Sequence, residues 1–231
     1  MHKLLLIRHG ESQWNYENRF TGWTNVDLTA KGIEQAKKAG SLISINGIRI
    51  DSIYCSYLKR AVNTCRICLN ELDLDNLRVI YDWRLNERHY GALQGLNKAE
   101  TAKKYGDNQV LKWRRSFDVA PPIMDINDDQ HPLNDPLYKN INPELLPSSE
   151  SLKDTLYRVK PLLDSELFPK VINGENIMVV AHGNSLRAIV KLLKNLSNEE
   201  IIKLNIPTGV PYLLELDKKL KVHKDYYLDN K

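Results

Sequence analysis

The sequence lacks any long run of apolar residues. Its N-terminal segment, MHKLLLIRHG, holds a short apolar stretch at residues 4–7, far below the roughly 18–20 residues that span a bilayer. No small-residue cleavage site follows that stretch, so we expect neither a membrane span nor a signal peptide. Residues 3–7 are better interpreted as the first strand of the fold.

Cysteine is scarce, with only Cys55, Cys65 and Cys68 in 231 residues. An odd, low count in a chain long enough to build a core argues against a disulfide framework and favours a cytoplasmic location. Cys65 and Cys68 form a C-x-x-C pair, but no second pair completes a four-ligand zinc site. Both fall on one helical apolar stripe in YLKRAVNTCRICLNEL, so we interpret them as core residues.

A strong charge of either sign is missing as well. The formal net charge is +4, and no block of Lys and Arg is interleaved with aromatic residues. We therefore expect no nucleic-acid partner, whereas an enzyme that handles small anions fits the composition. Metal-ligand patterns such as H-x-H-x-D and H-E-x-x-H are also missing, and Arg8 beside His9 would repel a cation, so no metal is expected.

Apolar runs alternate with helical patterns along the chain. This order predicts an α/β fold, a three-layer α/β/α sandwich with a mostly parallel central sheet and an antiparallel C-terminal hairpin. Continuous apolar runs are typical of parallel strands buried on both faces. The predicted strands are residues 3–7, 51–56, 77–81, 176–181, 212–216 and 220–226.

Capping signals predict the helices between these strands. Thr29 opens a helix to about Ser44 that buries Ile33, and Ser56 caps the helix that carries Arg60. Ser149 or Ser151 begins a long helix that Pro161 can kink. Further helices are predicted at about 97–115, at 184–193 and after the capping box SNEE at 197–200.

We expect residues 1–231 to form one domain with an insertion at about 96–147. This insertion is rich in Pro, Asp and Asn, and loops of such length in compact domains usually serve as lids or binding loops. A solvated insertion without a role is the alternative.

Two segments share one pattern, LLLIRHGESQWN at residues 4–15 and IMVVAHGNSLRA at residues 177–188. In each, an apolar run is followed by His-Gly and then by a helix start. Because parallel strands end at the same rim of a sheet, His9 and His182 should lie together. Gly10 and Gly183 would let the backbone approach a ligand, and the helix starts would favour an anion.

Phosphate is the anion that the neighbouring residues fit best. Arg8 and Arg60 would supply guanidinium groups that match phosphate oxygens, and their charges would keep a histidine neutral and nucleophilic. Glu87, in LNERHYGALQG, is a candidate proton donor and acceptor. For Arg60 and Glu87 a solvated surface position is the alternative. A second anionic group could be held by Lys98, Arg114 and Arg115, although an arginine pair is often only a solvated helix face.

The chain resembles the cofactor-dependent phosphoglycerate mutases of the histidine phosphatase superfamily. The matching segments follow one another in the same order from about Leu4 to Tyr227. The resemblance rests on LIRHGESQWNYENRFTGWTNVDLT, YCSYLKRAVNTC, RLNERHYGALQGLNKAE, WRRSFDVAPP, LPSSESLKDTLYRV, VVAHGNSLRAIVKLL and NIPTGVPYLLEL. Arg-His-Gly alone indicates only the superfamily. ENRFTGW, ERHYGALQG and WRRSFD are far more specific to the mutases.

The resemblance implies interconversion of 2-phosphoglycerate and 3-phosphoglycerate in glycolysis and gluconeogenesis, an isomerase reaction primed by 2,3-bisphosphoglycerate without a metal. It implies His9 as the nucleophile that becomes phosphohistidine, Glu87 as proton donor and acceptor, and His182 as a group that stabilises the transferring phosphoryl. Arg8 and Arg60 would clamp the phosphoryl oxygens. Other substrate- or phosphate-binding positions implied by the family are Ser12, Asn15, Thr21, Gly22, Tyr90, Lys98, Arg114, Arg115, Gly183 and Asn184.

The resemblance leaves two functions to compare. A histidine phosphatase acting on a small phosphorylated metabolite would usually lack the insertion that carries Arg114 and Arg115. The chain stops at YYLDNK, whereas many mutases continue with a Lys-, Ala- and Gly-rich tail thought to help cover the site, so the balance between mutase and phosphatase activity stays open here. Family members occur as monomers, dimers and tetramers, and we expect a homodimer.

Overall fold

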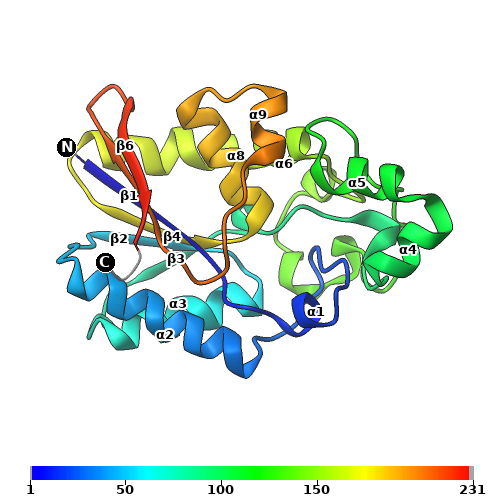
Figure 1. The fold of residues 1–231 in the computed structure, drawn as a ribbon, viewed down its shortest axis with the longest axis horizontal. Coiled ribbons are helices and arrows are strands. Elements are labelled where there is room, and N and C mark those ends of the chain that lie inside the picture. The colour runs from blue at the N-terminus through cyan, green and yellow to red at the C-terminus, as the bar shows by residue number, and fades with distance from the viewer. Residues whose placement is uncertain (1, 229–231) are drawn as a thin grey trace.

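The computed structural model describes residues 2–228, and a six-stranded sheet of order β3-β2-β4-β1-β5-β6 forms its centre (Figure 1). The strands are β1 (His2–Arg8), β2 (Ser52–Cys55), β3 (Val79–Tyr81), β4 (Ile177–Ala181), β5 (Tyr212–Leu216) and β6 (Val222–Tyr227). The first four pair in parallel, and β5 and β6 pair antiparallel. The predicted sheet and hairpin are thereby confirmed. The last three residues of YYLDNK lie outside the described residues.

Helices cover both faces of the sheet, which confirms the three layers (Figure 1). The sequence of β1 is continuously apolar because its alternate residues pack into the core on opposite faces of the sheet. Leu5 and Ile7 pack with α2 (Ala30–Ile45) and α3 (Lys59–Glu71). Leu4 and Leu6 pack on the opposite face with α6 (Leu152–Leu162) and α8 (Gly183–Lys194). A strand that packs against apolar side chains on both faces has no solvent-facing side for polar residues, so its sequence does not alternate between apolar and polar.

Most of the predicted helix starts are confirmed. Thr29, Ser151 and Ser197 cap α2, α6 and α9 (Asn198–Lys203) through their side chains. Beyond Pro161, α6 passes into a π-helical turn, η6 (Leu163–Leu167), and then into α7 (Phe168–Ile172). None of the described helices is long and apolar enough to cross a membrane.

Three local predictions about helices are wrong. Ser56 does not cap α3, whose N-cap is Leu58; the Ser56 hydroxyl accepts the N–H of Leu58 itself and is otherwise bonded to residues distant in sequence. Ile33 lies on the solvent side of α2. The predicted helix at 97–115 is divided into α4 (Lys98–Tyr105) and α5 (Asp107–Arg115), because Gly106 adopts a φ of +86°, which ends a helix.

Part of the insertion packs against the rest of the domain, although most residues between 118 and 147 are exposed. After α5 it forms three 3₁₀ turns that each begin at a proline: η3 (Pro132–Asn134), η4 (Pro136–Tyr138) and η5 (Pro143–Leu145). Proline suits the first position of such a turn, where no N–H donor is needed. The side chains of His131, Asp135 and Asn142 cap the three turns. Tyr138 is buried in a cluster with Trp23 and Leu146.

The three cysteines are free and buried, which confirms their assignment to the core. Cys65 and Cys68 lie in the layer between α2, α3 and the sheet. Burial raises the pKa of the Cys68 thiol. Such buried thiols are poor nucleophiles and metal ligands.

Candidate active site

The two His-Gly pairs meet at one rim of the sheet. In the parallel pairing of β1 with β4, Arg8 lies opposite Ala181, so the next residues leave the sheet side by side. The ring centroids of His9 and His182 are 4.9 Å apart, and both side chains are buried. The structure therefore brings together the two histidines that the repeated pattern selected.

His9 is held in one tautomer. Its Nδ1 lies 2.6 Å from the carbonyl oxygen of Gly10. Because a carbonyl can only accept, Nδ1 carries the proton and Nε2 keeps its lone pair. Arg60 Nε donates to Nε2 at 3.3 Å. Burial, and then the charges of Arg60 and Arg8, lower the pKa of His9 well below its usual value. The result is a neutral imidazole with a nucleophilic nitrogen next to fixed positive charge.

The glycines after the two histidines have different tasks. A Cβ on Gly10 would lie 2.2 Å from the carbonyl oxygen of Gly32, so Gly10 permits α2 to pack against this turn. The structure thus gives Gly10 a role in packing. The atoms nearest to a Cβ on Gly183 would be side-chain atoms of Arg8 and Glu87, at 3.6 and 3.7 Å. Gly183 borders the cavity itself.

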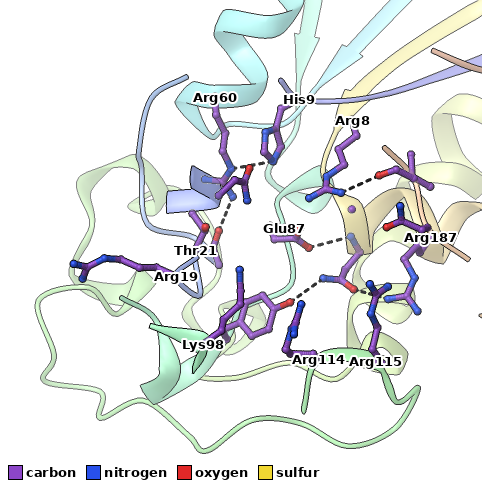
Figure 2. Close-up of a pocket in the computed structure, with 17 residues that line it drawn as sticks. Arg8, His9, Arg19, Thr21, Arg60, Glu87, Lys98, Arg114, Arg115 and Arg187 are labelled. Carbon is purple, nitrogen blue, oxygen red and sulfur yellow. Dashed lines mark hydrogen bonds between the residues drawn. The ribbon is translucent and has the colours of Figure 1, made fainter. Parts of the chain in front are cut away.

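The cavity beside His9 is strongly cationic. Figure 2 shows basic side chains from several elements around a common space, with Glu87 among them. The lining holds seven cations and one carboxylate, and such an excess favours anions. In the described part of the chain, no group of three or more His, Cys, Asp or Glu side chains could hold a metal ion. The cations are Arg8, Arg19, Arg60, Lys98, Arg114, Arg115 and Arg187.

Most of the predicted site residues line this cavity. The lining includes Arg8, His9, Asn15, Thr21, Gly22, Arg60, Glu87, Tyr90, Lys98, Arg114, Arg115, Gly183 and Asn184. Ser12 and His182 do not belong to it. Ser12 forms the capping box of α1 (Gln13–Tyr16), in which its hydroxyl accepts from the N–H of Asn15. His182 lies against His9 and is bonded to Ser56.

Arg60 is fixed by the backbone, and a solvated surface position is wrong for it. Its Nη1 donates to the carbonyl oxygen of Thr24 at 3.0 Å, and its Nη2 donates to that of Gly22 at 2.8 Å. Burial lowers the pKa of Arg60 to about 10, which still leaves it charged near neutral pH. Arg8 is anchored similarly, through Nη1 to the Ile206 carbonyl at 2.9 Å. Preorganised cations of this kind need no rearrangement to meet a phosphoryl group.

Glu87 is buried as well, so the solvated-loop alternative is wrong. Its Oε1 accepts from the backbone N–H of Arg88 at 2.7 Å and of Asn184 at 3.1 Å. The loop behind it is clamped by Arg158, which donates to the carbonyls of Asn86 and Glu87. Arg158 in turn forms a buried ion pair with Glu150 at 2.6 Å. These contacts fix where the carboxylate points.

Four residues of the lining were not predicted from the sequence: Arg19, Arg187, Asn205 and Ile206. Arg187 is the most informative of them. It is buried, donates through Nη1 to Asn184 Oδ1 at 2.9 Å and through Nη2 to the Ile201 carbonyl at 2.6 Å, and has no carboxylate partner within the described residues. Burial lowers its pKa to about 10. The signal in the sequence was a basic residue on the otherwise inward face of an apolar helix.

Comparisons with known proteins agree with this geometry. A sequence profile of the histidine phosphatase superfamily (branch 1) matches residues 4–227. A protein of Porphyromonas gingivalis named 2,3-bisphosphoglycerate-dependent phosphoglycerate mutase is 55% identical over 99% of this chain and 92% of its own length. A protein of Bacteroides thetaiotaomicron named 2,3-bisphosphoglycerate-dependent phosphoglycerate mutase 2 is 54% identical over 100% and 93%.

Solved structures share the fold at lower identity. A mycobacterial glucosyl-3-phosphoglycerate phosphatase in complex with VO3 superposes with a TM-score of 0.71, at 24% identity over 93% of each chain. The α-ribazole phosphatase of Shigella flexneri gives a TM-score of 0.71 at 23% identity, over 99% of this chain and 96% of its own.

Proposed function

The chain belongs to the histidine phosphatase superfamily, and from this premise we propose that it is a 2,3-bisphosphoglycerate-dependent phosphoglycerate mutase that interconverts 2-phosphoglycerate and 3-phosphoglycerate. Relatives that are 54–55% identical over nearly the whole chain carry this name. The observation that carries the proposal in the structure is the cavity of seven cations and one carboxylate beside a neutral histidine. A phosphoglycerate brings two anionic groups and a hydroxyl that must exchange a proton, which is what such a lining can serve.

The proposed reaction begins with priming by 2,3-bisphosphoglycerate. The Nε2 lone pair of His9 attacks a phosphorus atom, an N–P bond forms, and the P–O bond to the glycerate breaks. The leaving oxygen takes the proton of Glu87, and in the return step the hydroxyl that attacks phosphohistidine gives its proton back to Glu87. Arg8 and Arg60, both fixed at the rim, would neutralise charge on the phosphoryl oxygens throughout.

The remainder of the substrate would be bound by the cations of the insertion. Lys98, at the start of α4, and Arg114 and Arg115, at the end of α5, line the same cavity as His9. Bisphosphoglycerate carries a carboxylate and two phosphates, so its three anionic groups suit this excess of cations. We propose that Lys98, Arg114, Arg115 and Arg187 bind the carboxylate and the phosphate that is not being transferred.

One experiment tests the mutase assignment against a phosphatase on the same scaffold. Protein first stripped of phosphate is mixed with 3-phosphoglycerate, with and without 2,3-bisphosphoglycerate, and both 2-phosphoglycerate and inorganic phosphate are measured. We expect 2-phosphoglycerate to form rapidly only after priming, little phosphate release, and no loss of activity in EDTA. Phosphate as the main product would favour the phosphatase. Turnover that does not depend on the primer would refute the role of 2,3-bisphosphoglycerate as cofactor.

We also propose that residues 1–231 act as one domain, in a cytoplasmic homodimer without a nucleic-acid partner. The modest net charge of +4 supports the absence of a nucleic-acid partner, and the buried free cysteines support the cytoplasmic location. Sedimentation equilibrium at micromolar concentration would test the dimer directly.

A further inference from the structure

A buried chain of hydrogen bonds ends on His182. The Ser56 hydroxyl, directly after β2, lies 2.7 Å from His182 Nε2 and 2.8 Å from Asn86 Oδ1. The same oxygen accepts the backbone N–H of Leu58 at 3.1 Å. Ser56, Asn86 and His182 are all fully buried, so solvent cannot replace any of these partners.

The direction of the bonds follows from groups that can only donate or only accept. The backbone N–H of Tyr57 donates to Asn86 Oδ1 at 3.1 Å, and Asn86 Nδ2 lies 2.9 Å from the Tyr138 hydroxyl. The atom of Asn86 that faces Ser56 is therefore the amide oxygen, which only accepts. The single Ser56 proton must point to it. Both lone pairs of the Ser56 oxygen are then acceptors, one for Leu58 and one for His182.

We propose that Ser56 is a positioning residue that fixes neutral His182 in the tautomer protonated at Nε2. The opposite tautomer would set two lone pairs against each other at 2.7 Å. It would also place an N–H at Nδ1, which is buried and has no hydrogen-bond partner among residues 2–228. A buried donor without an acceptor is more costly than an unused lone pair, because folding removes its bond to water.

The two rim histidines then hold opposite tautomers. His9 carries its proton on Nδ1 and keeps a lone pair on Nε2, which accepts from Arg60 Nε. His182 carries its proton on Nε2, so Nδ1 is the one nitrogen that can accept another proton without breaking the bond to Ser56. A proton taken up at Nδ1 when a phosphoryl group binds would leave the ring anchored to Ser56. This catalytic consequence rests on the proposed function, whereas the tautomer itself does not.

The tautomer can be measured directly by nitrogen NMR on the full chain labelled with ¹⁵N-histidine, at a pH where the buried histidines are neutral. The spectrum of His182→Gln identifies the signals of His182 by difference. In the unaltered protein we expect a pyrrole-type signal for Nε2 and a pyridine-type signal for Nδ1 of His182, with the reverse pattern for His9. A His182 protonated at Nδ1 would overturn the proposal without any variant of Ser56.

Variants of the chain test the role of Ser56. Ser56→Ala should shift the His182 signals away from the pure Nε2-protonated pattern and lower kcat by about tenfold to a hundredfold, with a smaller change in KM. Ser56→Thr keeps the hydroxyl and should restore the pattern. Tyr138→Phe is the matched control: it removes a bond to the same Asn86 amide, but Tyr57 still orients that amide, so the His182 tautomer should not change.

The outcomes separate this proposal from the proposed function. An unchanged His182 pattern in Ser56→Ala would overturn the role of Ser56. A changed pattern in Tyr138→Phe would overturn the inference that the Tyr57 N–H suffices to orient the Asn86 amide. A protein that shows the expected tautomers but no mutase turnover would refute the proposed function alone.

Discussion

Replacing Arg187 by methionine tests whether this residue contributes to substrate binding. The variant removes a buried cation from the cavity and two hydrogen bonds, one to Asn184 Oδ1 at 2.9 Å and one to the Ile201 carbonyl at 2.6 Å. The first bond matters for the ligand. By accepting from Arg187, the Asn184 oxygen is turned away, and Asn184 Nδ2 is left near the Tyr90 hydroxyl at 3.4 Å, as a donor on the cavity side.

The magnitude in KM follows from the charge-assisted hydrogen bond that Arg187 is proposed to donate to the substrate. A hydrogen bond to a charged group contributes about 1.5–3 kcal/mol, and each 1.4 kcal/mol corresponds to about a factor of ten. We therefore expect KM for 3-phosphoglycerate to rise by about tenfold to a hundredfold in Arg187→Met. We expect kcat to fall less, because His9 and Glu87 are held by other contacts. Arg187→Lys, which keeps the charge but cannot reach both acceptors, should lie between.

The assay is steady-state turnover of 3-phosphoglycerate at saturating primer, with thermal unfolding of each variant measured in parallel. Arg66→Met is a suitable control, since it makes the same replacement on the exposed side of α3. A double-mutant cycle with Asn184→Ala isolates the coupling. An unchanged KM in Arg187→Met, or strictly additive effects in the cycle, would refute the reasoning.

Three further predictions concern the reaction, acid stability and packing. His9→Ala should abolish turnover, and Glu87→Gln should lower kcat by about a hundredfold or more while the circular dichroism spectrum is kept; full activity in His9→Ala would exclude the phosphohistidine. Burial lowers the pKa of His89 to about 3, so below pH 6.5 the unfolded chain binds a proton that the folded chain does not. Because of this residue, the free energy of unfolding should fall by about 1.4 kcal/mol for each unit by which the pH decreases. Urea unfolding at pH 7.5 and 5.5 should show a shallower pH dependence in His89→Gln, and equal slopes would contradict this cause. Gly10→Ala should destabilise the protein by about 1–3 kcal/mol, because its Cβ would meet the Gly32 backbone; an unchanged urea midpoint would argue against that contact.

The sheet was predictable because its central strands are buried on both faces. The run from Leu4 to Ile7 has no polar residue that would suit a solvent-facing side, and the run at 177–181 is alike. Helix starts at Thr29, Ser151 and Ser197 were predictable because a cap depends on residues only three positions apart. These signals are local, and local physics is sufficient for them.

The errors arose where a distant partner overrides a local preference. Ser56 has the chemistry of an N-cap, yet its hydroxyl is bonded to Asn86, thirty residues away, and to His182, 126 residues away. Arg187 was overlooked because a basic residue in an amphipathic helix normally faces water, and only the fold shows that α9 and the cavity enclose it. The catalytic candidates Arg8, His9 and Glu87 were found through motifs, but the contacts that fix their orientation were not.

The pairing of β1 with β4 also has a consequence for biosynthesis. Leu4 lies opposite Ile177, and the backbone N–H of Gly209 donates to the Arg8 carbonyl at 2.9 Å, so the rim of the site is closed by residues far along the sequence from β1. A nascent polypeptide therefore cannot assemble the site before Gly209 has left the ribosome, whichever part of it has already folded. Pairing across so many residues is also slow, because the loop must close before its contacts form. Recovery of turnover after dilution from denaturant should accordingly coincide with the last phase of refolding.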